Sequence, residues 1–295
     1  MGGMTPRVQS APRGARTVSI LSATMLTVAT TGCSAAEDGG DPVDATSAVP
    51  VLTAEVTAEH PFDPSSFTQG LEVMPDGDLL VSTGLNGESR IYRAPVDDAA
   101  SPTVSEDLDE RYFGEGATVH GDTVWQLTWK SGVAFARDAE TLAVTDEASY
   151  DGEGWGLCSD GDRLVMSDGS PTLTFRDPAT FAPTGSVEVT LDGDPVDEIN
   201  ELECTGSGDG KTVWANVWHS DRILRIDPTT GDVTGVVDLD LPAGDRDGAD
   251  VLNGIAENRT DRADGADGAD GADGTSFLVT GKLWDTLYEV QFSEE

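Results

Sequence analysis

Phe113-Gly114-Glu115-Gly116 is one of five short polar anchors in this 295-residue chain, and two runs of strand-forming residues follow each anchor. The other anchors are Phe67-Thr68-Gln69-Gly70, Glu153-Gly154-Trp155-Gly156, Asn200-Glu201-Leu202-Glu203 and Leu252-Asn253-Gly254. Steps of 46, 40, 46 and 52 residues separate the aligned positions Gly70, Gly116, Gly156, Leu202 and Gly254. This period is typical of a β-propeller blade and not of a helical repeat.

The residues after each anchor predict strands, because they are continuously apolar or alternate, and Asp/Gly turn signals precede most of them. The second-strand runs are 79–82, 124–129, 163–167, 213–218 and 277–280. The last repeat lacks a fourth strand, whereas the run 51–57 precedes the first repeat and has no other partner. We therefore predict an all-β fold, a five-bladed β-propeller closed by an N-terminal strand that completes the last blade.

The N-terminus has the pattern of an exported lipoprotein. Three arginines precede the uncharged, largely apolar stretch 17–31, and Gly32-Cys33 then resembles the end of a bacterial lipoprotein signal. We predict a signal peptide at 1–32, lipidation of Cys33 and a flexible tether at 33–49. An ordinary signal peptide cut nearby is the alternative. Either interpretation places the folded part, 50–295, outside the cytoplasm, and the membrane is reached only through the lipid anchor.

The chain is strongly acidic, with a formal net charge of −38. Such a surface repels phosphate, so a nucleic-acid partner is excluded. A solvated acidic surface is the simplest explanation, and attraction of cationic substrates such as a free peptide α-amine is the other. We expect a monomer.

Two further features leave alternatives open. Cys158 and Cys204 occupy matching places in successive repeats, so an oxidising compartment permits a disulfide. Two buried free thiols fit equally well, because the sequence does not give the Cα separation that a disulfide needs. Ala-Asp-Gly triplets at 263–274 interrupt the fifth repeat, and their period of three favours a disordered surface insertion over a calcium-binding glycine repeat.

The anchors and neighbouring strand ends carry a carboxylate, an ammonium group, two amides and several aromatic rings. They are Phe67, Gln69, Phe113, Glu115, Trp129, Trp155, Asn200, Trp218 and Lys282. In a five-fold array they would converge on the axis and line a small-ligand pocket, in which a buried Glu has a raised pKa. Taken singly, each residue also has a structural explanation: tryptophans such as Trp125 and Trp214 fill propeller cores, and glycines relieve crowding near the axis.

Taken together, the motifs resemble the plant and bacterial type of glutaminyl-peptide cyclotransferase. The resemblance covers about residues 50–293 and rests on Phe67-Thr-Gln-Gly-Leu71, Tyr112-Phe-Gly-Glu-Gly-Ala-Thr118, Gly154-Trp-Gly-Leu157, Asn200-Glu-Leu-Glu203, Trp214-Ala-Asn-Val-Trp218, Leu252-Asn-Gly-Ile-Ala256 and Thr280-Gly-Lys-Leu-Trp284, in this order. It implies a five-bladed propeller and a metal-independent acyltransferase without a cofactor. The implied reaction converts the N-terminal Gln of a peptide or protein to pyroglutamate and releases ammonia.

The resemblance also implies roles for the candidate residues. Glu115 would be the acid/base, and Lys282 would polarise the amide or order the site. Gln69 and Asn200 would hydrogen-bond the substrate, while the substrate pocket would be formed by Phe67, Phe113, Trp129, Trp155 and Trp218.

Two other classes of function remain open. A non-catalytic propeller lipoprotein would capture a peptide or small ligand at the same mouth, although mere binding does not need a buried carboxylate. A metal-dependent, lactonase-like propeller would use Glu115, Asn200 and Asn253 around an axial calcium ion. The three histidines show no metal-ligand spacing, so we predict no metal site.

Overall fold

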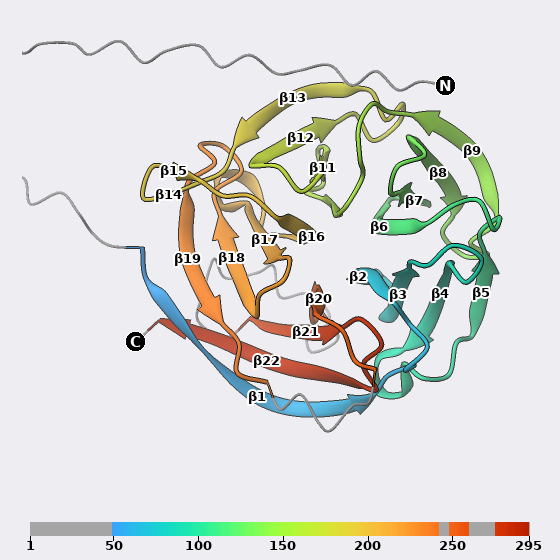
Figure 1. The fold of residues 1–295 in the computed structure, drawn as a ribbon, viewed down its shortest axis with the longest axis horizontal. Coiled ribbons are helices and arrows are strands. Elements are labelled where there is room, and N and C mark those ends of the chain that lie inside the picture. The colour runs from blue at the N-terminus through green and yellow to red at the C-terminus, as the bar shows by residue number, and fades with distance from the viewer. Residues whose placement is uncertain (1–48, 242–247, 260–274, 295) are drawn as a thin grey trace, which may run out of the picture. The chain divides into compact units, whose positions relative to one another are not determined.

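The structure is a computed structural model that describes residues 49–241, 248–259 and 275–294 (Figure 1). All of them belong to one structural unit, Thr46–Glu295. The predicted signal peptide 1–32, the lipidation candidate Cys33, the tether up to residue 48 and the Ala-Asp-Gly insertion 263–274 lie outside the described residues.

The described chain is all-β, apart from the short 3-10 turns η1 (Val96–Asp98) and η2 (Gly208–Gly210). The first three repeats each form a four-stranded antiparallel sheet. Their strands are β2 (Thr68–Val73), β3 (Asp78–Thr83), β4 (Arg90–Pro95) and β5 (Val104–Asp107); β6 (Gly114–His120), β7 (Thr123–Thr128), β8 (Val133–Asp138) and β9 (Val144–Ser149); and β10 (Leu157–Ser159), β11 (Leu164–Met166), β12 (Thr172–Arg176) and β13 (Pro183–Glu188). The small hairpin β14 (Thr190–Leu191) and β15 (Asp194–Pro195) follows.

The last two repeats share one eight-stranded sheet in the order β16-β17-β18-β19-β1-β22-β21-β20. Its strands are β16 (Ile199–Thr205), β17 (Thr212–Val217), β18 (Arg222–Ile226), β19 (Val233–Asp238), β1 (Val51–Pro61), β20 (Leu252–Glu257), β21 (Ser276–Gly281) and β22 (Thr286–Glu294). As predicted, the N-terminal strand β1 pairs with the last strand: it lies antiparallel to β22 from Leu52↔Glu294 to Pro61↔Thr286. It also makes a short parallel contact with β19, and this contact joins the two repeats into one sheet.

The first strands of the repeats lie nearest the centre in Figure 1, where β2, β6, β16 and β20 are labelled. They contact one another in a closed order: β2 lies against β6 and β20, β10 lies against β6 and β16, and β16 lies against β20. A Cβ added to Gly116 would lie 2.6 Å from the carbonyl oxygen of Trp155, and one added to Gly156 would lie 2.1 Å from that of Asn200. Glycine is therefore required where these strands approach each other. The arrangement of the sheets around their first strands is β-propeller-like.

Apolar side chains from adjacent repeats pack between the sheets. One cluster joins Val165 and Phe175 of the third repeat to Leu202 and Leu224 of the fourth. The outer strands β5 and β9 take little part, since most of their side chains are exposed. The core therefore lies between the sheets and holds the first strands in place around the centre.

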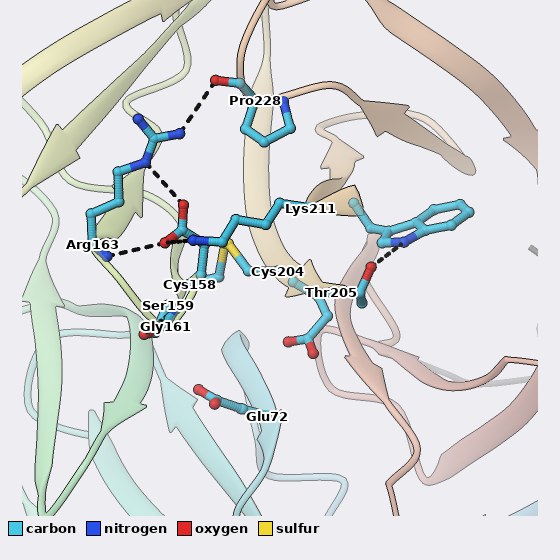
Figure 2. The surroundings of a disulfide bond; sticks show 12 residues. Glu72, Cys158, Ser159, Gly161, Arg163, Cys204, Thr205, Lys211 and Pro228 are labelled. Atoms are coloured by element: carbon cyan, nitrogen blue, oxygen red, sulfur yellow. Dashed lines mark hydrogen bonds and ion pairs between the residues drawn. A yellow bond between two sulfur atoms is a disulfide. The ribbon is translucent and has the colours of Figure 1, made fainter. Parts of the chain in front are cut away.

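Cys158 and Cys204 form a disulfide, with Cα atoms 5.4 Å apart, which decides between the two sequence-based interpretations. Figure 2 shows this bond between β10 and β16, near Lys211 and Arg163. Both of these cations pair with Asp160, at 3.0 Å and 2.9 Å. The disulfide thus fixes two neighbouring inner strands to each other.

Candidate functional site

Glu115 lies at the start of β6 and is only 3% exposed. Gln69, at the start of β2, donates from Nε2 to Glu115 Oε1 at 3.0 Å. Asn253, at the start of β20, donates from Nδ2 to Gln69 Oε1 at 3.0 Å and to the Thr68 carbonyl at 3.0 Å. Because the Gln69 oxygen accepts from Asn253, its amide nitrogen faces Glu115, and three inner strands hold the carboxylate in place.

The backbone of Glu115 is held from the neighbouring strands. Ser82 of β3 donates its hydroxyl to the Glu115 carbonyl oxygen. Gln126 of β7 donates from Nε2 to the Ser82 hydroxyl at 2.9 Å, and its Oε1 accepts from Arg137 Nε at 2.9 Å. This buried network fixes the strand that carries the carboxylate, and the sequence reasoning did not identify Ser82 or Gln126.

Burial is the main reason that the pKa of Glu115 lies well above its ordinary value. The nearby charge of Lys282 and the Gln69 hydrogen bond oppose this shift, whereas the charge of Glu153 adds to it. Lys282 is only 4% exposed, and burial lowers its pKa against the opposing influence of Glu115 and Asp250. A carboxyl group and an ammonium group whose pKa values are drawn toward neutrality are suited to proton exchange and charge stabilisation.

The five predicted aromatic residues form two groups. In the first, Phe113 contacts Phe67 and Trp129, with ring centroids 6.1 Å and 5.5 Å apart, and Lys282 Nζ lies 4.9 Å from the Phe67 centroid. In the second, Trp155 and Trp218 meet edge to face at 5.3 Å.

All five residues are half-buried. The contrast with the two packing tryptophans is clear. Trp125 and Trp214 are 4% and 5% exposed and lie inside hydrophobic clusters, as predicted.

Asn200 is buried at the start of β16, and its carbonyl oxygen accepts from Ser167 Oγ at 2.6 Å. Its side-chain Oδ1 has no hydrogen-bond partner among the described residues, and the same holds for Asn253 Oδ1. Both oxygens are buried, and buried acceptors of this kind are costly when unpaired.

Glu153 and Glu201 are the main residues that the sequence reasoning missed. Glu153 accepts from both Trp129 and Trp155 and thereby connects the two aromatic groups. Glu201 accepts from the backbone N–H of Leu71 at 3.2 Å and of Ile255 at 2.8 Å, and is therefore a buried bridge between inner strands. A usable signal existed for Glu201, because its anchor is the only one of the five that contains no glycine, and Glu201 stands directly before the aligned position Leu202.

The donor set does not favour the metal-dependent alternative. Around Glu115, Gln69 presents an amide N–H and Lys282 an ammonium group, and both oppose a cation at the carboxylate. Within residues 49–241, 248–259 and 275–294, no group of three or more His, Cys, Asp or Glu side chains is arranged to hold a metal ion.

The same part of the chain contains no helix with the length and hydropathy that a membrane crossing needs.

A separate cavity of about 820 Å³ opens at the other ends of the inner strands. Its lining includes Glu72 of β2, Val119 of β6, Ser159 of β10 and Glu257 of β20. None of the nine candidate residues lines it, so the volume of this cavity is not evidence for or against the site around Glu115.

Comparison with known proteins bears out the resemblance drawn from the motifs. Residues 24–292 match the family model described as "Glutamine cyclotransferase". The chain is 37% identical over 247 residues to the Arabidopsis thaliana protein "Glutaminyl-peptide cyclotransferase", covering 81% of this chain and 71% of that protein. It is also similar to the crystal structure of Myxococcus xanthus glutaminyl cyclase, with a TM-score of 0.71, 35% identity and coverage of 83% of this chain and 99% of that one.

Proposed function

Because the chain belongs to the glutamine cyclotransferase family, we propose that it converts the N-terminal Gln of peptides or proteins to pyroglutamate. In this acyl transfer the α-amine nitrogen attacks the γ-carbonyl carbon, a C–N bond closes the ring, and the bond to the side-chain nitrogen breaks to release ammonia. The single observation that carries the proposal is the buried Glu115, hydrogen-bonded to Gln69 and close to Lys282, beside a set of half-buried aromatic rings.

Glu115 moves the proton in this reaction. The attacking amine must lose a proton and the leaving nitrogen must gain one, so a single carboxylate between them serves as base and then as acid. The raised pKa of Glu115 suits both steps near neutral pH. Intramolecular attack needs little beyond correct positioning, and the three-strand network around Glu115 supplies a fixed reference for it.

Lys282 and the two buried amides complete the polar part of the site. The Lys282 ammonium group stabilises negative charge that develops on the γ-carbonyl oxygen. The unpaired Oδ1 of Asn200 accepts from an N–H group of the substrate, and Gln69 orients Glu115 and contacts the substrate amide.

The aromatic residues form the walls of the substrate pocket. Phe67, Phe113, Trp129, Trp155 and Trp218 enclose the methylene groups of the Gln side chain with their exposed faces. A non-catalytic propeller that captures a peptide at the same mouth is the alternative function.

We also propose the finer architecture and the cellular setting. The repeats make five blades, with β1 as the outer strand of the blade that β20, β21 and β22 begin. The chain is exported by a lipoprotein signal at 1–32, anchored through Cys33 to the outer face of the cell membrane, and held away from it by the tether. It acts as a metal-independent, acidic monomer without a nucleic-acid partner.

Ammonia release from a Gln-initiated dipeptide by the purified chain tests this function. We expect release that persists in EDTA, together with a product lighter by one ammonia. The matched control is the same dipeptide with an acetylated α-amine, which has no nucleophile and should not react. No release from several Gln-initiated peptides that nevertheless bind would favour the binding alternative, and release abolished by EDTA would refute metal independence.

A further inference from the structure

Glu153 binds two tryptophans with one oxygen atom. Its Oε2 accepts from Trp129 Nε1 at 2.7 Å and from Trp155 Nε1 at 3.1 Å. Its other oxygen, Oε1, lies 3.3 Å from Lys130 Nζ. A shared acceptor fixes the two indole rings relative to each other, because neither ring can turn without breaking a charge-assisted hydrogen bond.

The two tryptophans come from different parts of the fold. Trp129 directly follows β7 and contacts Phe113, whereas Trp155 precedes β10 and contacts Trp218. Glu153 therefore links the two aromatic groups through their side chains, in addition to the backbone hydrogen bond that Gly154 N–H donates to the Trp129 carbonyl oxygen at 2.9 Å. If Glu153 were removed, Trp129 would keep its ring contact with Phe113. The Lys130 ammonium group, 3.9 Å from the centroid of the Trp129 ring, would also remain.

The carboxylate of Glu153 remains charged at neutral pH. Partial burial acts to raise its pKa, but the hydrogen bonds from Trp155, Trp129 and Lys130 outweigh this and hold the pKa below its ordinary value. The side chain is 37% exposed, so Glu153 lies at the rim of the site and not in the core.

We propose that Glu153 is a positioning residue of the substrate pocket, which holds the indoles of Trp129 and Trp155 as two fixed walls for the Gln side chain. The inference rests on the function proposed above and adds to it a residue that acts through other side chains. It predicts that Glu153 affects substrate binding more than the chemical step, because the rings that it fixes contact the substrate and not the transferred proton.

Three variants test the proposal. Glu153→Ala removes the acceptor, and Glu153→Gln keeps an acceptor oxygen without the charge. Lys130→Gln removes the exposed ion pair and the ammonium group over the Trp129 ring, but leaves the carboxylate that accepts from both indoles. We expect a KM about 10- to 100-fold higher for Glu153→Ala, with kcat changed less than about threefold, as for the loss of hydrogen bonds to a charged group. Glu153→Gln and Lys130→Gln should stay within about threefold of the wild-type KM.

The near-UV circular dichroism of the tryptophans gives a second readout, because it decreases when indoles lose a fixed orientation. Glu153→Leu, which has a similar volume and no acceptor, replaces Glu153→Ala if that variant does not fold. An unchanged KM in the variants without an acceptor, or a loss in Glu153→Gln equal to that in Glu153→Ala, would overturn the proposal. A wild-type chain without turnover would instead refute the proposed function, and the dichroism alone would then decide whether Glu153 fixes the indoles.

Discussion

Breaking the disulfide between Cys158 and Cys204 should destabilise the fold by a calculable amount and leave the site intact. The bond joins residues 46 positions apart in sequence. If the cross-link acts mainly by restricting the unfolded chain, a loop of this length corresponds to about 4 kcal/mol of stability. Either single variant, Cys158→Ala or Cys204→Ala, removes the cross-link, so both should lose about this amount.

Urea unfolding at neutral pH measures the loss, with the wild-type chain in a reductant as the control. The unfolding free energy of the reduced wild type should match that of the single variants. Activity below the unfolding transition should be unchanged, because Cys158 and Cys204 lie toward the strand ends that border the cavity of about 820 Å³, away from Glu115. A loss below about 1 kcal/mol would refute the loop argument, and a folded but inactive variant would refute the separation of the bond from the site.

Three further substitutions have expected outcomes that follow from the structure. Lys282→Met should move the acidic limb of the kcat/KM profile to higher pH, because the lysine charge lowers the pKa of Glu115; an unmoved limb would show that the two charges do not interact. Gly156→Ala should lower the unfolding free energy in urea by about 1–3 kcal/mol, because the added Cβ would lie 2.1 Å from a carbonyl oxygen of β16. The control Gly185→Ala, whose added Cβ would lie 3.5 Å from its nearest neighbour, should lower it little, and equal losses would contradict the crowding argument. Glu201→Gln should reduce the pH dependence of stability, because burial raises the pKa of Glu201 in the folded state: the stability contributed by its protonated form is fully present below the unfolded-state pKa of about 4.3 and is lost as pH rises through the folded-state pKa. An unchanged slope of unfolding free energy against pH would refute this.

The sequence predicted the parts of the fold that depend on local pattern. The apolar runs at β3, β7, β17 and β21 were recognisable, because both faces of these strands are buried. Strands β5 and β9 were missed because their residues are mostly polar and exposed, so neither periodicity nor hydropathy marks them.

The site was predictable where a residue lies inside a repeated anchor. Glu115 and Gln69 hold matching places in successive anchors, and the structure joins them by a hydrogen bond. Glu153 was missed because its importance depends on two indole groups that meet only in three dimensions. The disulfide could not be decided for the same reason, since the 5.4 Å Cα separation is a property of the fold.

The central claim is that Glu115 transfers the proton during cyclisation, and the turnover of Glu115→Gln tests it most directly. The amide oxygen of the variant can still accept from Gln69, so the fold should persist, and the urea midpoint checks this. We predict that kcat for ammonia release from a Gln-initiated dipeptide falls by about 10²–10⁴-fold. A folded variant with a near-normal rate would contradict the account.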